Sequence, residues 1–413
     1  MRDLDVLIVG GGPAGLAAAC AAYDAGCRSL AVVERESSAG GILKQCIHPG
    51  FGLHTFGKEL TGPEYANEYK KMALDRGINI ITDTFVTRVE KGRVTLRSKV
   101  GVQKLNVGAT VLAMGCRERP RGALNVPGTR PSGIFTAGSA QRLVNIEGYM
   151  PGKRAVILGS GDIGLIMARR MTLEGARVGA VCEIMPYSGG LARNIEQCLN
   201  DFGIPLYLST TVTAVHGKER LTGVTVARVD ESRQPIPGSE RFIECDTLLL
   251  SVGLIPENEL TLALGAKMDP VTGGPTVDEN RMTSVEGVFA AGNVLHVHDL
   301  VDFVSKEAAI AGRAAALYAM GKDLPGADIG IVAEGSVRYT VPGRISAAGA
   351  EIYLRVGKCE RNVRIKAMAG DITLAEKKIA RAAPGEMISI DVKNIPDTVE
   401  KITVIMEKDG KQI

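Results

Sequence analysis

The sequence predicts an α/β chain with two three-layer domains, one inserted into the other, followed by a small all-β domain. Two observations predict the α/β part. A glycine-rich turn follows a short apolar run twice, at Gly10–Gly15 and, 149 residues later, at Gly159–Gly164. A glutamate stands 24 positions after the first glycine of each turn, at Glu34 and Glu183. Beyond about residue 330, short alternating segments predict the strands of the all-β domain.

The first turn follows the apolar run 5–9, precedes a predicted helix from Ala14 to about Ala25, and is separated from Glu34 by a second apolar run. This order of strand, turn, helix, strand and acid is that of a Rossmann-like unit. Glycines allow close approach of a pyrophosphate at a helix N-terminus, and the acid accepts hydrogen bonds from a ribose 2′-hydroxyl. The candidate cofactor-binding residues are Gly10, Gly12, Pro13, Ala14, Gly15, Glu34, Arg35 and Gly41.

The second turn repeats this order after the apolar run 154–158, with a helix predicted to end near Gly175. The candidate residues of this unit are Gly159, Gly161, Asp162, Ile163 and Glu183, and Gly253 is a further cofactor-binding candidate. A carboxylate suits the 2′-hydroxyl of NAD and repels the 2′-phosphate of NADP. No arginine pair follows Glu183, so NADH is favoured over NADPH, although another adenine nucleotide stays an alternative.

Further strands are predicted at 246–253 and 285–293, and a long amphipathic helix is predicted to reach Tyr318. The alternating segments of the C-terminal region predict a β-sandwich of about 80 residues. These segments are 336–341, 351–356, 362–367, 372–379, 387–392 and 402–406.

Composition excludes several classes of protein. A net charge of +3 over 413 residues, without a basic run, argues against a nucleic-acid partner. The apolar runs are too short for a transmembrane segment, and the N-terminal sequence is not that of a signal peptide. Eight cysteines without paired spacing fit a reducing cytoplasm better than a disulfide framework.

Residues 3 to about 325 resemble the two-dinucleotide-domain flavoproteins that include thioredoxin reductase. The resemblance lies in the two glycine turns with their acids, in Ala109–Gly115 and in Gly287–Asn293. It implies FAD in the first unit, with Ala113, Gly115, Gly292, Asn293, Asp302 and Phe303 as further contacts, and NAD(H) in the second. The implied domains are a split FAD domain (1–118 and 253–326), an NAD domain (119–252) and a C-terminal domain (330–413).

A narrower resemblance lies in residues 40–52, 116–120 and 293–300. These segments are similar to flavin subunits of opine oxidase, amino-acid dehydrogenase and cyanide synthase complexes. They are more similar to the accessory oxidoreductase that accompanies a glycerol-3-phosphate dehydrogenase subunit in some anaerobic bacteria. The resemblance implies a small cysteine-rich subunit together with a partner flavoprotein dehydrogenase subunit. Whether the chain also forms a homo-oligomer stays open.

Thioredoxin reductases carry a Cys-x-x-Cys pair in the NAD domain, and this chain has none. Cys46 is the remaining candidate redox thiol, and His48 is a candidate proton relay. The alternatives are a buried thiol packed at the flavin edge and a loop histidine that bonds to backbone. His296 and His298 stand two apart without a recognisable third ligand, so no metal site is predicted.

We therefore expect a cytoplasmic FAD-dependent oxidoreductase that passes hydride between NAD(H) and flavin, as the electron-transfer subunit of a dehydrogenase complex. One alternative is a stand-alone NADH oxidase or peroxide reductase that uses Cys46. Another is a non-catalytic nucleotide-binding subunit. The C-terminal domain is expected to mediate docking and to matter for assembly but not for flavin reduction.

Overall fold

The computed structural model describes residues 2–412 and divides into two compact units. The first unit contains Met1–Cys116 and Pro256–Ile413, and the second is Arg117–Ile255. The chain therefore leaves the first unit once and returns to it once. The predicted fold class is confirmed: two Rossmann-type parallel sheets and a strand-rich C-terminal region are present.

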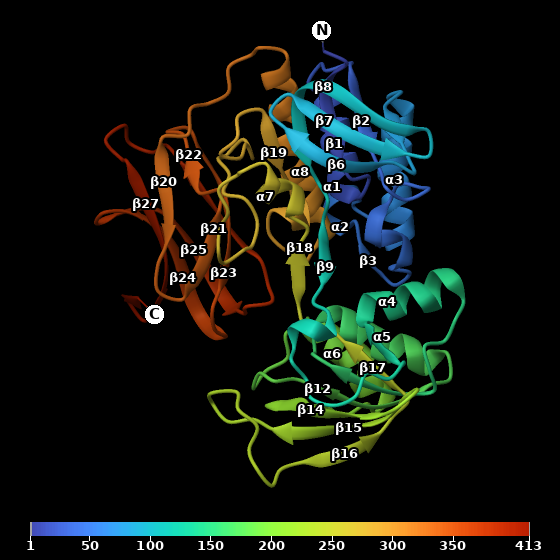
Figure 1. Cartoon of the computed structure of the whole chain (residues 1–413). Coiled ribbons are helices and arrows are strands. Elements are labelled where there is room, and N and C mark those ends of the chain that lie inside the picture. Colours follow the sequence, from blue (N-terminus) through green and yellow to red (C-terminus); the bar gives the residue numbers. More distant parts are fainter. Residues whose placement is uncertain (1, 413) are drawn as a thin grey trace. The chain divides into compact units, whose positions relative to one another are not determined.

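The parallel sheet of the first unit has the strand order β5-β2-β1-β8-β19. Figure 1 labels four of these strands, β1, β2, β8 and β19. Three of its strands are almost completely buried, as expected for a parallel sheet that is covered on both faces. The first half of β8 turns away from β1 and pairs with an antiparallel hairpin, β6 and β7. The strands are β1 (Leu4–Val9), β2 (Leu30–Val33), β5 (Asn79–Ile81), β6 (Phe85–Glu90), β7 (Arg93–Ser98), β8 (Gly101–Leu112) and β19 (Val288–Ala290).

Helices α1 (Pro13–Asp24) and α8 (Val301–Ala319) pack closely together in this unit. Both carry runs of buried alanine, and at their contact Gly312 faces the backbone of Ala18, where a Cβ atom would overlap the carbonyl group. The close packing brings the beginning of α8 beside the first glycine turn. Helix α3 (Gly62–Asp75), the short helix α2 (Leu53–Phe56) and the hairpin β3 (Pro49–Phe51) and β4 (Leu60–Thr61) complete this part of the unit.

The second unit has a five-stranded parallel sheet of order β10-β17-β11-β12-β13 and a three-stranded antiparallel sheet, β14-β15-β16. Its helices are α4 (Ala137–Arg142), α5 (Asp162–Leu173) and α6 (Ala192–Cys198). The strands are β10 (Ile134–Thr136), β11 (Arg154–Leu158), β12 (Arg177–Cys182), β13 (Leu206–Tyr207), β14 (Thr210–Gly217), β15 (Leu221–Arg228), β16 (Arg241–Glu244) and β17 (Thr247–Leu250). The chain passes from one unit to the other through β9 (Cys116–Glu118) and returns through β18 (Leu254–Pro256), and α7 (Glu259–Ala263) follows.

The C-terminal region is a sandwich of two sheets around a core of valine and isoleucine. One sheet has the order β22-β20-β27-β24-β25, with β28 beside β27, and the other is β21-β23-β26. The strands are β20 (Ile329–Ala333), β21 (Val337–Val341), β22 (Arg344–Ile345), β23 (Gly349–Val356), β24 (Glu360–Ala369), β25 (Ile372–Ala382), β26 (Ile388–Lys393), β27 (Lys401–Lys408) and β28 (Lys411–Gln412).

The C-terminal sandwich is not separated from the rest of the first unit. Tyr339 and Val341 of β21 belong to the same buried cluster as Leu7 and Val9 of β1 and Leu295. The sandwich therefore shares a hydrophobic core with the first nucleotide-type sheet. A domain used for docking alone would not need such a shared core.

Candidate functional site

The first glycine turn, Gly10–Gly15, is shaped by backbone contacts that leave no room for side chains. Gly10 has φ of 105°, and a Cβ atom there would overlap the carbonyl oxygen of Ala113 at the end of β8. A Cβ atom on Gly15 would overlap the carbonyl oxygen of Gly10. Strand, turn and helix can pack this closely only because both positions are glycine.

The carboxylate of Glu34 is buried and already oriented. Its Oε2 accepts from the amide of Gly11 at 2.8 Å, and its Oε1 accepts from the amide of Glu36 at 2.9 Å. Each oxygen has a second lone-pair direction, which can accept from a ribose hydroxyl. Arg35 is exposed, and Gly41 lies against Gly12 with φ of 57°.

The second glycine turn, Gly159–Gly164, repeats this geometry. Glu183 Oε2 accepts from the amide of Ser160 at 2.8 Å, and Oε1 accepts from the amide of Met185 at 2.9 Å. Gly159 has φ of 97°, and a Cβ atom there would overlap the carbonyl oxygen of Ser251. The hydroxyl of Ser160 adds a third hydrogen bond to Glu183, at 2.7 Å.

Helices α1 and α5 begin at the two turns, and neither has a side-chain cap from the residue that precedes it. The residues before α1 and α5 are Gly12 and Gly161, which have no side chain to accept from the first amides. Leu300, before α8, cannot cap that helix either. By contrast α3 is closed by a capping box in which Thr61 and Glu64 bond each other's backbone. The amide of Gly164, in the first turn of α5, donates to Ser251 Oγ. The preceding amides of α5, the first amides of α1 and the two helix dipoles favour a phosphate-bearing ligand at the two turns.

Gly292 and Asn293 lie beside the first turn, as expected from the sequence motif that contains them. A Cβ atom on Gly292 would come within 2.9 Å of Ala14 Cβ. Asn293 is half-buried; its Oδ1 accepts from the amide of His298, and its Nδ2 lies 3.5 Å from Cys116 Sγ. Ala113 contacts Gly10, and Gly115 has positive φ with open space around its Cα.

Asp302 and Phe303, predicted to contact the cofactor, anchor a neighbouring loop. The carboxylate of Asp302 accepts from the amides of Gly52 at 3.2 Å and Thr55 at 2.8 Å. The ring of Phe303 stacks with that of His54, with centroids 6.1 Å apart. The first turn of α8 thus holds the glycine-rich loop that begins near His48.

Cys46 and His48 are the residues predicted to be catalytic. The surroundings of Cys46 argue against a reactive thiol. Burial raises the pKa of the Cys46 thiol to about 12, so the thiolate is not populated at neutral pH. The Cys46 Sγ lies 3.4 Å from the carbonyl oxygen of Ile42. The ring of His48 is bonded through Nδ1 to the carbonyl oxygen of Pro49 and lies 5.0 Å from the ring of Phe51.

In the second unit, Asp162 also has a structural task. Its Oδ1 accepts from the amide of Leu191 at 2.8 Å and from Asn194 Nδ2 at 2.7 Å, which holds the segment after Glu183 against the turn. Ile163 and Gly161 are partly buried. Gly253 is exposed with φ of 102°, and its carbonyl oxygen accepts from the amide of Arg119.

A group of residues that the sequence did not bring together lies beside Gly292. His296, His298 and Glu307 are buried together and bring three metal-ligand-type atoms within 4.8 Å of one another. No third partner for the two histidines is recognisable in the sequence, and the structure brings Glu307. Glu307 lies on the same buried face of α8 as Val304, Ala308 and Ala311. An acid at a predicted buried position of an amphipathic helix is the sequence signal that could have identified Glu307.

Among the residues described, no helix is both long and apolar enough to cross a membrane. The described cysteines form no disulfide.

Comparisons with known proteins agree with this geometry. The model of the pyridine nucleotide-disulphide oxidoreductase family matches residues 4–338. An opine oxidase subunit of Agrobacterium tumefaciens is 25% identical over 342 residues, which cover 76% of this chain and 65% of that protein. Thioredoxin reductase of Treponema pallidum is 28% identical, over 76% of this chain and 97% of its own. The chain thus spans just under two thirds of the opine oxidase subunit.

Among solved structures, the thioredoxin reductase of T. acidophilum superposes with a TM-score of 0.63 and 26% identity. The match covers 78% of this chain and 99% of that protein. The family model ends at residue 338, so the C-terminal sandwich lies largely beyond it.

Proposed function

The chain belongs to the pyridine nucleotide-disulphide oxidoreductase family, and we propose that it is the electron-transfer subunit of a dehydrogenase complex of the glycerol-3-phosphate or amino-acid/opine type. Family membership establishes an FAD- and NAD(P)H-dependent oxidoreductase. The further step, to an electron-transfer subunit, is the proposal. Its partners would be a small cysteine-rich subunit together with a substrate-oxidising flavoprotein subunit.

The residues of the first turn fit FAD. The oriented carboxylate of Glu34, the glycine-only contacts at Gly10 and Gly15, and the free amides of α1 suit an adenosine ribose and a pyrophosphate. Gly292 and Asn293 border the same turn and would hold the ribityl part. When bound, FAD supplies two-electron chemistry by accepting a hydride from NADH and releasing electrons to an acceptor.

The residues of the second turn fit NADH. Glu183 would bind the ribose 2′-hydroxyl and repel a 2′-phosphate, and the amides at the start of α5 would face the pyrophosphate. The preference for NADH over NADPH is part of the proposal.

The observation that carries the subunit role is the absence of a usable thiol pair among the described residues. Thioredoxin reductases, which this chain resembles, carry a Cys-x-x-Cys pair for exchange with a disulfide. Here none of the eight cysteines forms a disulfide, no Cys-x-x-Cys occurs, and the pKa of Cys46 is raised to about 12 by burial. Electrons therefore leave the flavin for an acceptor outside this chain. The similarity to a protein that is by name one subunit of opine oxidase supports the same conclusion.

The experiment that tests this role compares wild type with Cys46→Ser, and uses Cys359→Ser as control because Cys359 is an exposed thiol of the C-terminal domain. We expect all three proteins to reduce an artificial dye with NADH at rates within about twofold of one another. Turnover with oxygen or hydrogen peroxide should be slow in all three. Fast peroxide turnover that collapses only in Cys46→Ser would contradict the proposal and identify a stand-alone NADH oxidase or peroxide reductase.

A further inference from the structure

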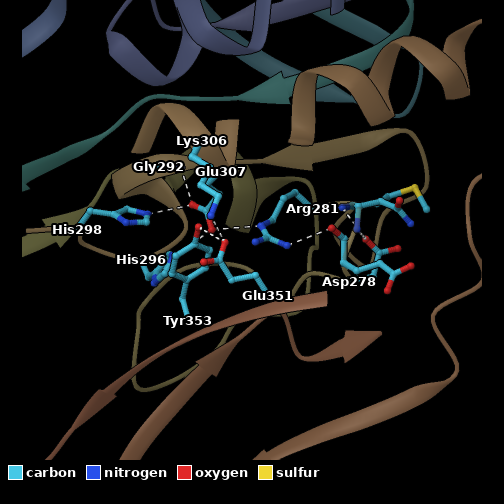
Figure 2. A network of polar contacts seen from close by, with 12 residues as sticks. Asp278, Arg281, Gly292, His296, His298, Lys306, Glu307, Glu351 and Tyr353 are labelled. Carbon is cyan, nitrogen blue, oxygen red and sulfur yellow. Dashed lines mark hydrogen bonds and ion pairs between the residues drawn. The ribbon is translucent and has the colours of Figure 1, made fainter. Parts of the chain in front are cut away.

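Buried polar groups surround the carboxylate of Glu307, in the second turn of α8 (Figure 2). Nη2 of Arg281 and Nδ1 of both histidines are buried there without a hydrogen-bond partner. Its Oε1 accepts from Arg281 Nε at 3.1 Å and from His296 Nε2 at 3.0 Å. Its Oε2 accepts from His298 Nε2 at 3.0 Å and from the amide of Gly292 at 3.1 Å. Arg281, Gly292, His296, His298 and Glu307 form what we call the Glu307 cluster.

The charges of the cluster already balance. Glu307 and Arg281 are 0% and 1% exposed, so the guanidinium is the counter-charge of the carboxylate. Burial lowers the pKa of His296 to about 4, and that imidazole is neutral at pH 7. A divalent cation would add two positive charges beside a carboxylate that already has a buried guanidinium as counter-charge, and it would compete with four donors for the same carboxylate lone pairs. The arrangement is therefore that of a hydrogen-bonded hub and not of a metal centre.

The C-terminal sandwich closes the cluster from one side. Tyr353 of β23 is completely buried, with its ring centroid 6.1 Å from those of both histidines, and the ring of Tyr339 lies 5.8 Å from His296. Arg355 Nη2 donates to the carbonyl oxygen of Val297 at 3.0 Å. Without the sandwich, the carboxylate and guanidinium would face water.

The other side of the cluster is the turn at the first nucleotide site. Gly292 donates its amide to Glu307, and a Cβ atom at Gly292 would approach Ala14 at the start of α1. The next residue, Asn293, accepts at Oδ1 from the amide of His298, whose ring is also held by Glu307. The position of the Asn293 carboxamide therefore depends on the cluster at two points.

We propose that Glu307 is a positioning residue of the FAD site, and that the C-terminal β-domain is a component of that site because it seals the Glu307 cluster. The cluster fixes the Gly292–His298 turn before the cofactor binds. This inference rests on FAD binding to the first turn and is independent of the electron-transfer-subunit role. It differs from the sequence expectation that the C-terminal domain serves docking and does not affect flavin reduction.

The test uses the full-length protein and three variants: Glu307→Gln, Arg281→Met and the double variant. Each single variant leaves one unbalanced buried charge, and we expect both to unfold at lower temperature than wild type. The double variant removes both charges and should recover most of that loss. Its dissociation constant for FAD should still rise at least tenfold, because the carboxamide introduced by Glu307→Gln keeps only one acceptor oxygen for the amide of Gly292 and the two imidazoles.

The flavin potential separates positioning from a general loss of structure. Glu307→Gln leaves the positive charge of Arg281 and should raise the potential, whereas Arg281→Met leaves the negative carboxylate and should lower it. Lys306→Gln is the matched control, since Lys306 adjoins Glu307 on α8 but is exposed and pairs with Glu351 of the sandwich at 2.6 Å. The control should bind FAD as wild type does. A folded double variant with unchanged FAD affinity, or single variants that shift the potential in the same direction, would overturn the proposal.

Two measurements on wild type need no variant. Hydrogen exchange of residues 291–300 should be slow in the FAD-free protein and should change little when FAD binds. Protection that arises only on FAD binding would show that the cluster does not prearrange the turn. Purified protein should contain no stoichiometric metal. One equivalent of zinc in wild type that is absent from Glu307→Gln would show that the Glu307 cluster is a metal site.

The contribution of the sandwich is tested by Tyr353→Leu, which shortens the side chain over the two imidazoles, and Tyr353→Phe, which keeps the ring. We expect Tyr353→Leu to weaken FAD binding in the same direction as the double variant, and Tyr353→Phe to leave it unchanged. Equal affinity in wild type and Tyr353→Leu would contradict a role for the C-terminal domain in the site.

Discussion

The two glycine turns are copies of each other in their backbone and differ in what completes them. In both, the acid accepts from the amide one residue into the turn and from the amide two residues beyond itself, at 2.8 and 2.9 Å. Thr84 and Thr210 donate their amides to the carbonyl oxygens of Glu34 and Glu183, and each follows a residue with positive φ. The repeat thus extends well beyond the glycines.

The first turn has a third layer of support that the second lacks. Gly292, α8, the Glu307 cluster and the C-terminal sandwich all lie in its own unit. Buried residues of α8 cluster with Val6 and Ile8 of β1, and two residues of β21 cluster with Leu7 and Val9. The second turn is completed by the short stretch around Ser251, whose hydroxyl accepts from the amide of Gly164 at 3.1 Å. The same turn geometry thus fits two uses. The first turn, with more residues packed around it, suits a cofactor that stays bound, and the second turn, with fewer, suits a nucleotide that exchanges.

The largest expected effects come from replacing the first glycine of each turn by alanine. Gly10→Ala should weaken FAD binding at least about 100-fold, which corresponds to ~3 kcal/mol, because its Cβ atom overlaps Ala113 and φ is positive. Gly159→Ala should leave a yellow protein that NADH no longer reduces. Absorbance of the purified proteins and NADH titration measure both.

Two other glycines with positive φ have open space where a Cβ atom would lie. Alanine at these positions introduces backbone strain without a steric clash and serves as the control. Gly57 and Gly175 have positive φ, and a Cβ atom at either position would have nothing within 4 Å, so Gly57→Ala and Gly175→Ala should keep both ligands. Loss of FAD in Gly159→Ala would mean that the two turns do not act separately.

The next expected effect is a pH dependence of the free energy of unfolding, which comes from the Glu307 cluster beside the first turn. Burial lowers the pKa of His296 to about 4 from an ordinary value of 6.5, so the folded protein resists a proton that the unfolded chain accepts. The free energy of unfolding should therefore fall as pH falls from about 6.5 to about 4, by up to about 3 kcal/mol from this group.

Denaturant unfolding of wild type and His296→Gln across that range measures this contribution. His296→Gln should show a flatter profile, and His54→Gln, which changes an exposed histidine, should follow wild type. Identical slopes in wild type and His296→Gln would contradict the neutral state assigned to His296 in the cluster.

A smaller effect is expected at the acid of the second turn. Glu183→Gln should raise the dissociation constant for NADH about 10- to 100-fold, as expected for loss of one hydrogen bond to a charged group. It should also narrow the preference for NADH over NADPH, because the repulsion of the 2′-phosphate disappears. Glu174→Gln, in an exposed ion pair with Arg170 of the same unit, is the control. An unchanged preference would show that Glu183 does not select the nucleotide.

The sequence was sufficient for the fold class because its signals are local. Each glycine turn lies between an apolar strand and a helix, and each C-terminal strand alternates along its length, so α1, α5, β21 and the strands β23 to β27 could be placed closely. The strand predicted at 285–293 is shorter, at Val288–Ala290, because the chain turns at Gly292. Strands β20 and β22 were missed because they are short and pair with distant segments.

The site was less predictable because its contacts are long-range. Glu34 and Glu183 could be identified from spacing, but the role of Asp302 depends on Gly52 and Thr55, about 250 positions earlier. Glu307 meets Arg281 and two histidines only after α8 docks, and Tyr353 arrives from another sheet. Burial, which raises the pKa of Cys46, is likewise a property of the folded chain.

The most direct test of the central claim is an anaerobic titration of the FAD-bound protein with NADH and, separately, with NADPH, followed through the flavin absorbance. We predict stoichiometric bleaching by NADH at concentrations where NADPH has little effect. Bleaching by neither nucleotide would contradict the claim, because the second turn would then be a binding site without a part in electron transfer.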